Sequence, residues 1–119
     1  MKTREFLEEN GVDVARGIEL LGDMDMYNET INDFLNETLD KIPKLLDYKN
    51  NNDMENYAIV VHSIKSDSKY LGFTTLAELA YNHEMESKAN NIDYVNSNYD
   101  ELMREVNRII NVIKEYIGG

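Results

Sequence analysis

The sequence predicts an all-α protein, an antiparallel up-and-down four-helix bundle with one or two short N-terminal helices. Apolar residues recur three and four positions apart through several long stretches, and this spacing indicates helices that each bury one face. The connections between these stretches are short, so consecutive helices are expected to lie side by side and to run in opposite directions. No stretch shows the alternation of apolar and polar residues that indicates a strand.

Length and composition limit the number of domains and the classes of partner and binding site. With 119 residues and 42% hydrophobic side chains, we expect one domain over 1–119, with short helices in 1–22 and the bundle in 23–117. The net charge of -11 argues against binding to nucleic acid or to anionic lipid surfaces. The absence of cysteine excludes disulfides and thiolate metal sites. No apolar run reaches the length of a signal peptide or a membrane span, so we expect a cytoplasmic protein without membrane insertion.

The N-terminal segment is expected to form two short helices. Thr3 can cap the first, which closes at Gly11, and Asp13 can open the second, which ends at Gly22. Helices this short are not stable alone. They must therefore lie against a longer element.

The first long helix is expected from about Asp23 or Asp25 to Lys49. Its apolar stripe is formed by Tyr27, Ile31, Phe34, Leu35, Ile42, Leu45 and Leu46. Pro43 lies inside this helix, where it removes one backbone hydrogen bond and clashes with the preceding turn. Because the stripe resumes in register, we expect a kink near 39–42 rather than a break.

Three more helices follow. Asp53 can cap the second, which ends near Gly72, and the capping-box spacing of Thr75 and Glu78 predicts a third that reaches about Ala89. The fourth has the most regular pattern, with alternating steps of four and three that are typical of a left-handed bundle. Its seam is formed by Val95, Tyr99, Leu102, Val106, Ile109, Ile113 and Tyr116.

The second long helix carries a histidine outside its apolar face. The buried arc is formed by Tyr57, Val61, Ile64, Ser68 and Leu71. With about 100° between successive residues, His62 lies well outside this arc, whereas Lys65 and Lys69 follow on its own side of the helix. We therefore expect an exposed imidazole beside two ammonium groups. The other histidine, His83, lies on the apolar line of its helix and is interpreted as a half-buried structural residue.

An exposed histidine between lysines suits phosphoryl chemistry. Neutral imidazole is a good nucleophile, and an exposed histidine is mostly neutral at physiological pH without any neighbouring base. A phosphoryl group brings close to two negative charges, which Lys65 and Lys69 would partly offset. Phosphoryl transfer depends mainly on positioning and charge neutralisation. A histidine on a rigid helix is therefore sufficient if a partner protein brings the metal ion and the other reacting group.

The stretch from His62 to Gly72 reads HSIKSDSKYLG. It resembles the motif of the histidine-containing phosphotransfer (HPt) domains, roughly H-x-L-K-G-S/A-S/A-x-x-L-G. The resemblance extends over nearly the whole chain, through Gly22, Asp23, Tyr27 and Phe34 upstream and through Leu76, Ala77 and Leu79 downstream. It implies a two-component phosphorelay protein that accepts a phosphoryl group on His62 from a receiver-domain aspartyl phosphate and passes it to another receiver. Such a protein is a carrier with a transient phosphohistidine rather than a stand-alone enzyme.

The resemblance and the positions of the neighbouring side chains together give roles to the surrounding residues. Lys65 and Lys69 would support the phosphoryl group, and Gly72 would end the helix. The receiver would dock on Glu55, Ile59 and Ser66. The implied partners are receiver domains and a hybrid sensor histidine kinase. The protein would hold no metal or cofactor of its own, since Mg²⁺ is expected on the receiver, and we expect a monomer because the site must admit that partner.

Specific residues argue against three other functions. A di-iron bundle needs a glutamate three residues before each histidine, and neither His62 nor His83 has one. A zinc protease needs a second histidine where Ser87 stands. A histidine kinase usually has a proline where Asp67 stands. Ser66 occupies the place of the glycine in the HPt motif, which leaves one alternative open: a receiver-docking module that resembles an HPt domain but is not phosphorylated.

Overall fold

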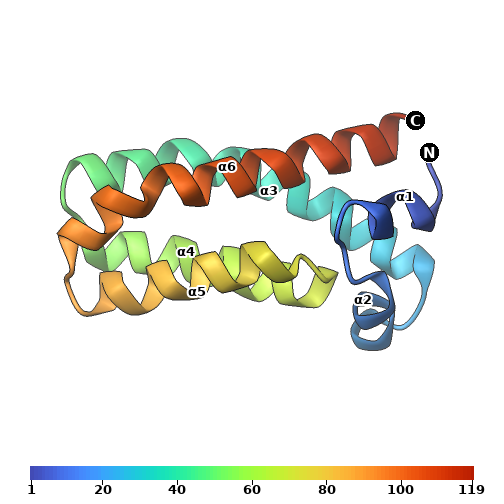
Figure 1. Ribbon diagram of the computed structural model, residues 1–119, viewed down its shortest axis with the longest axis horizontal. Coiled ribbons are helices and arrows are strands. Elements are labelled where there is room, and N and C mark those ends of the chain that lie inside the picture. Colours follow the sequence, from blue (N-terminus) through green and yellow to red (C-terminus); the bar gives the residue numbers. More distant parts are fainter.

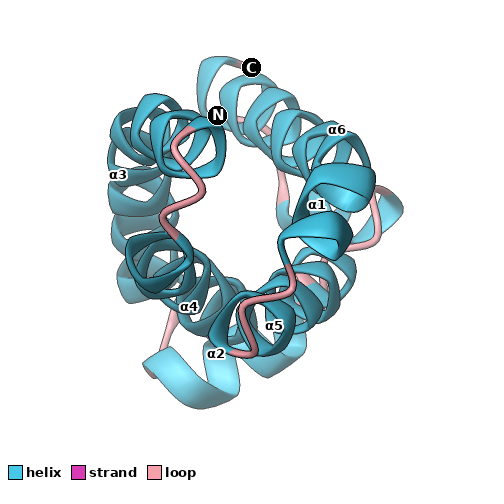
Figure 2. Ribbon diagram, turned by 90° about the vertical axis from the view of Figure 1, so that its left-hand side faces the viewer, coloured by secondary structure: helices cyan, strands magenta, loops and turns pink.

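The computed structural model describes all 119 residues, which form six helices and no strand. Figure 1 shows the four longer helices packed as an antiparallel bundle, and the view along the bundle in Figure 2 shows them arranged in a ring in chain order. The predicted fold class is confirmed. The helices are α1 (Arg4–Glu9), α2 (Val14–Leu21), α3 (Met24–Asn50), α4 (Met54–Leu71), α5 (Thr74–Lys88) and α6 (Ile92–Gly118).

Short polar side chains set most helix starts. The Asp13, Asp23 and Asp53 side chains each accept a hydrogen bond from the backbone N–H three residues later, and so does the side chain of Asn91. These bonds satisfy N–H groups that have no partner within the helix. At the end of α4, Gly72 has a φ of 82°, a left-handed conformation that glycine adopts without steric cost.

The predicted capping box at the start of α5 is wrong. The helix begins at Thr74, its N-cap is Phe73, and no side chain caps it. Phe73 is buried and its ring packs edge-on against that of Phe34, 5.1 Å between centroids. Because this packing fixes the chain directly after Gly72, the helix starts earlier, and Thr75 lies inside the first turn instead of at the cap.

The core lies between the four long helices. The whole predicted arc of α4 is buried, and so is the α6 seam apart from Tyr99, which is partly exposed. The α3 stripe differs more, because Leu46 is 41% exposed and Thr38 occupies a fully buried position. Helix α3 continues through Pro43 without a break. None of the six helices is long and apolar enough to cross a membrane.

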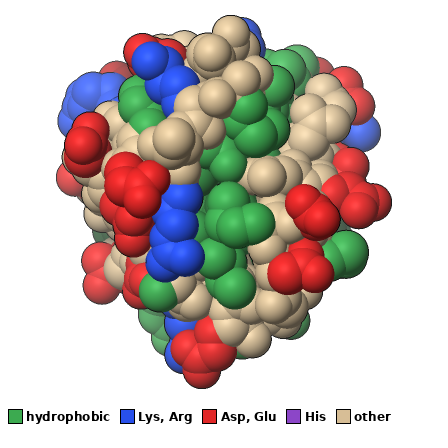
Figure 3. Space-filling model, turned by 90° about the vertical axis from the view of Figure 1, so that its right-hand side faces the viewer, with side chains coloured by type: hydrophobic (Ala, Val, Ile, Leu, Met, Phe, Trp, Pro, Cys, Tyr) green, Lys and Arg blue, Asp and Glu red, His purple; other side chains and the backbone are tan.

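The two short helices lie at one end of the bundle, beside both termini (Figure 1). The backbone N–H of Lys2 donates to the Tyr116 carbonyl at 2.8 Å, so the start of the chain is tied to α6. Seen from this end, hydrophobic side chains reach the surface between charged groups (Figure 3).

Candidate functional site

His62 lies on the outer side of α4, next to α5. Its side chain is 55% exposed, whereas the apolar arc of the same helix is buried. The expected exposed position of the imidazole is therefore what the structure shows. The ring does not stand free in solvent, however, because a side chain of α5 contacts it.

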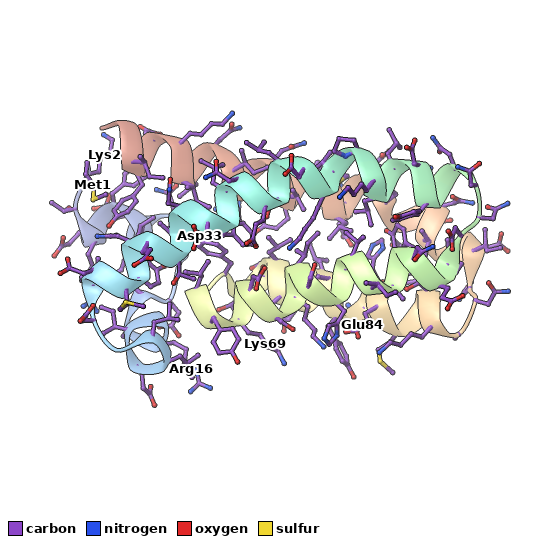
Figure 4. All side chains as sticks on the ribbon, turned by 180° about the vertical axis from the view of Figure 1, so that it is seen from behind. Met1, Lys2, Arg16, Asp33, Lys69 and Glu84 are labelled. Atoms are coloured by element: carbon purple, nitrogen blue, oxygen red, sulfur yellow. The ribbon has the colours of Figure 1, made fainter.

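That side chain is Glu84, which sequence reasoning missed. Its carboxylate is only 2% exposed, and its Oε2 lies 2.6 Å from Nδ1 of His62. The Lys88 ammonium contacts the same oxygen at 2.7 Å, and the Lys65 ammonium lies 2.7 Å from Oε1. A buried carboxylate is costly unless it is paired. Here three side chains from two helices pair the Glu84 carboxylate, and Figure 4 labels this residue.

These contacts set the charge of Glu84. Burial by itself raises the pKa of a carboxyl group, but the hydrogen bonds from Lys65, Lys88 and His62 outweigh it and lower the pKa of Glu84 to about 2. The group is therefore a carboxylate at neutral pH. A carboxylate only accepts hydrogen bonds, so Nδ1 of His62 must carry the hydrogen and donate it.

The tautomer follows from this contact. With the hydrogen on Nδ1, the other ring nitrogen of His62, Nε2, keeps its lone pair. No hydrogen bond or ion pair engages Nε2. The ring is thus held by one nitrogen and open at the other, in the form that a nucleophile needs.

The two predicted lysines are placed differently. Lys65 Nζ lies 3.4 Å from Nδ1 of His62, and its side chain is largely buried between Glu84 and the face of the Tyr81 ring. Lys69 forms no ion pair or hydrogen bond and is exposed one turn further along α4. The structure therefore brings Lys65 to the imidazole and leaves Lys69 apart from it, because seven residues of helix separate Lys69 from His62 by about 10 Å.

A hollow opens beside the imidazole, and we call it the His62 hollow. Of the predicted docking residues, Glu55 and the 63% exposed Ile59 line it, whereas Ser66 is half-buried and lies outside it. Lys88 closes the α5 side. The lining residues are Met54, Glu55, Ala58, Ile59, His62, Glu84, Ser87, Lys88 and Asn90.

His83 has the opposite environment. It is 1% exposed, so it is more deeply buried than the half-buried position expected for it. Its Nδ1 lies 2.8 Å from the Tyr57 hydroxyl, and its Nε2 lies 3.1 Å from the Asn98 carbonyl. Because a carbonyl only accepts, Nε2 carries the hydrogen and Nδ1 accepts from Tyr57. Burial lowers the pKa of His83, so the ring is a neutral structural group.

Asp67 faces away from the imidazole. Its carboxylate pairs with the Lys41 ammonium of α3 at 3.3 Å, so this residue joins two helices and takes no part in the site. No group of three or more histidine, cysteine, aspartate or glutamate side chains is placed to hold a metal ion.

The comparison with protein families settles the class of protein. The family model described as the Hpt domain matches residues 19–112, which includes the whole of α3, α4 and α5. This chain belongs to the Hpt domain family. Neither the curated proteins nor the solved structures gave a match.

Membership of the Hpt family has direct consequences. The chain is a histidine phosphotransfer module of two-component signalling. Proteins of this family generally carry phosphoryl groups rather than act as catalysts, and they interact with receiver domains and kinases in phosphorelays.

Proposed function

We propose that this Hpt domain is an active phosphocarrier, in which Nε2 of His62 accepts a phosphoryl group from the aspartyl phosphate of one receiver domain and gives it to another. The observation that carries the proposal is the 2.6 Å contact between Nδ1 of His62 and Glu84. It fixes the ring in one tautomer and leaves the exposed nitrogen with a free lone pair. An imidazole that is buried, or that forms hydrogen bonds at both nitrogens, has no such nitrogen.

The transfer step balances without a proton leaving the ring. The Nε2 lone pair attacks phosphorus, the N–P bond forms, and the P–O bond to the receiver's aspartate breaks, so that the aspartate leaves as a carboxylate. The ring then carries a hydrogen on Nδ1 and the phosphoryl group on Nε2, and it is formally cationic. Glu84 lies against that Nδ1–H and offsets the ring's charge. The reverse step returns the electron pair to Nε2, so one geometry serves both directions.

The phosphoryl group gains its counter-charges from the same cluster. Lys65 and Lys88 both lie within 2.7 Å of Glu84 oxygens, and therefore close to the imidazole that Glu84 holds. The Lys88 side chain is well exposed, so its ammonium is free to turn toward a phosphoryl group. Lysine ammonium groups are suitable partners for phosphate oxygens. This chain supplies a nucleophile and cations, and the Mg²⁺ ion belongs to the receiver domain.

The direct test is labelling by a phosphorylated receiver domain with Mg²⁺, followed by intact mass and acid lability of the label. We expect one acid-labile, base-stable phosphate on the original protein and none on a His62→Gln variant. A label that survives the substitution would remove His62 from the mechanism. A receiver that binds tightly without any labelling, and binds the His62→Gln variant equally well, would establish the docking module instead.

A further inference from the structure

Helices α3 and α6 lie on the other side of the bundle from His62. In Figure 2 they complete the ring opposite α4 and α5, the two helices that carry the candidate site. They pack less closely on each other than α4 and α5 do, so apolar side chains of both helices are only partly buried against the core. These side chains are Leu35, Ile42, Tyr99 and Met103.

The outward side of these two helices carries very little charge, and we call it the α3–α6 face. On α3 it consists of a line of exposed residues at alternating steps of four and three, Asn32, Asn36, Leu39, Pro43, Leu46 and Asn50. On α6 the corresponding line is Asn96, Asp100, Met103, Asn107, Asn111 and Lys114. Leu39 is 42% exposed and Leu46 is 41% exposed. The face is therefore partly apolar and bordered mainly by asparagine.

This composition favours another copy of the same chain as the partner. The net charge is -11, and a charge of this size makes two copies repel each other over most of their surface. Contact surfaces between protein chains are depleted in charged side chains at their centre. The α3–α6 face has this property, so it is a surface on which two copies can approach without strong repulsion.

Two contacts show which residues of α3 and α6 lie at the same height along the bundle. At one end, the Lys49 ammonium lies 4.9 Å from the centre of the Tyr99 ring. Toward the other end, the Tyr116 hydroxyl donates to the side-chain oxygen of Asn28 at 2.6 Å. The middle of the α3–α6 face lies halfway between these two contacts.

The two charges of the face are placed symmetrically about this middle. Leu39 of α3 and Asn107 of α6 lie there, halfway between the two contacts. Asp100 and Lys114 are seven residues before and after Asn107, which corresponds to about 10 Å on each side. Both are exposed, and neither forms an ion pair within the chain. Charges of opposite sign thus lie at equal distances from the middle.

This symmetry makes the face complementary to itself. In a two-fold symmetric contact, residues at equal distances on opposite sides of the axis face each other across the two copies. With the axis at the middle of the face, Asp100 faces Lys114 of the second copy, and Lys114 faces Asp100 of the second copy. A parallel pairing would instead place like charges together. The two ion pairs therefore favour the antiparallel arrangement and set its register.

The face is also large enough for a dimer, and its use leaves the candidate site open. The Cα atoms extend over 40 × 24 × 20 Å, so a face along the longest axis covers about 800 Å², the area that each partner contributes to a standard interface. His62 is on the α4 and α5 side. A monomer was expected because His62 must admit a partner, and pairing through the opposite face meets the same requirement.

We propose that this protein forms a symmetric dimer through the α3–α6 face. Helix α6 runs antiparallel to α6 of the second copy, and α3 runs antiparallel to α3 of the second copy. Leu39 and Asn107 lie at the two-fold axis, with an Asp100–Lys114 ion pair on each side of it. The two His62 side chains face away from each other, so each copy can receive a partner at the same time.

The test is sedimentation of the whole chain at concentrations from about 1 μM to about 1 mM, which covers the dissociation constants of weak and moderate dimers. We expect the mass to rise from that of one copy to that of two. Asp100→Lys and Lys114→Asp each create two like-charge contacts and should weaken the dimer about tenfold. The double variant exchanges the two charges, so it should restore the dimer to within about threefold of the original. This restoration is specific to the antiparallel pairing.

The matched controls are Asp33→Lys and Lys44→Asp, the same charge changes at exposed positions of α3 that lie outside the α3–α6 face. They correct for the change in net charge and should not weaken the dimer. A mass of one copy at every concentration would overturn the proposal, and so would a dimer in which the face variants behave like the controls or the double variant is no better than the single ones. Phosphoryl transfer plays no part in this measurement, so the dimer and the proposed function can fail independently. Circular dichroism checks that every variant folds.

Discussion

The two histidines of this protein lie on neighbouring helices and have opposite surroundings. His62 is 55% exposed, and only Nδ1 has a bonded partner, the buried carboxylate of Glu84. His83 is 1% exposed, and both of its nitrogens have partners. One ring nitrogen of His62 therefore has no hydrogen-bond partner, whereas both ring nitrogens of His83 have one. A nucleophilic imidazole needs a partner that orients it and a second nitrogen that remains free, and only His62 has both.

The hydrogen positions differ as well. A carboxylate holds the hydrogen of His62 on Nδ1, and a backbone carbonyl holds that of His83 on Nε2. The partner of each ring therefore decides which nitrogen carries a lone pair. In His83 that nitrogen accepts from the Tyr57 hydroxyl, so it has no role in transfer.

The largest expected effect separates the two rings directly. His62→Gln should abolish labelling by a phosphorylated receiver. His83→Gln should be labelled at the original rate, because residue 83 lies inside the bundle, away from the bound receiver. The measurement is the time course of incorporated phosphate for both variants. Loss of labelling in a folded His83→Gln variant would contradict the conclusion that only His62 takes part in transfer.

Removal of the Glu84 carboxylate is the next largest change. Glu84→Ala frees Nδ1 of His62 and leaves Lys65 without its partner, so transfer should slow by roughly 10- to 100-fold, the equivalent of one charge-assisted hydrogen bond of about 1.5–3 kcal/mol. Glu84→Gln keeps an acceptor for Nδ1–H but loses the charge, and it should slow transfer less. Single-turnover transfer rates at saturating receiver measure both. Equal rates for the original protein and Glu84→Ala would show that the carboxylate does not orient the ring.

Substitution of the buried ring, His83, should change the free energy of unfolding rather than the rate of transfer. His83→Gln disturbs the bonds to the Tyr57 hydroxyl and the Asn98 carbonyl, and a buried polar group left unpaired costs about 1–3 kcal/mol. Denaturant unfolding at pH 7 measures the difference in free energy of unfolding. His62→Gln is the comparison and should cost less than His83→Gln, because its ring is 55% exposed and Lys65 and Lys88 still pair the Glu84 carboxylate.

Acid should destabilise the protein in two steps. The pKa of His83 in the folded protein is lowered by burial from 6.5, so the unfolded chain takes up a proton first and stability falls as the pH drops below about 6.5. The pKa of Glu84 is lowered from 4.5 to about 2, so a further loss occurs as the pH falls from about 4.5 toward 2. Unfolding free energies between pH 7.5 and pH 3 test this. The first step should be missing in His83→Gln, and its persistence there would assign it to another group.

The smallest expected effect concerns Asp67, which the imidazole does not contact. Asp67→Ser removes the ion pair with Lys41, whose partners are both partly exposed, and such pairs contribute about 0.2–1 kcal/mol. Labelling should be unchanged. A large loss of transfer would place Asp67 in the site after all.

The fold was largely predictable because it depends on local patterns. Aspartate caps and a left-handed glycine mark the ends of α4, and the spacing of apolar residues placed His62 outside its buried arc. The start of α5 was not predictable from its capping-box spacing, because the packing of Phe73 on Phe34 joins parts of the chain far apart in sequence.

In the candidate site, too, contacts within one helix were predictable and contacts between helices were not. Lys65 follows His62 on one helix, so the period of that helix was enough to bring the two together. Glu84 comes from the next helix, and its contact with His62 depends on the register between α4 and α5, which the apolar pattern of either helix alone does not set. Glu84 and Lys88 form an ion pair four residues apart on α5, but that spacing does not reveal the histidine that completes the cluster.

The most direct test of the account is a long-range ¹H–¹⁵N spectrum of the histidine side chains before and after phosphorylation by a receiver. We predict that His62 carries its hydrogen on Nδ1 before transfer and the phosphoryl group on Nε2 afterwards, while the signals of His83 stay those of an Nε2–H ring. A phosphoryl group on Nδ1, or an unmodified His62 in labelled protein, would contradict the account.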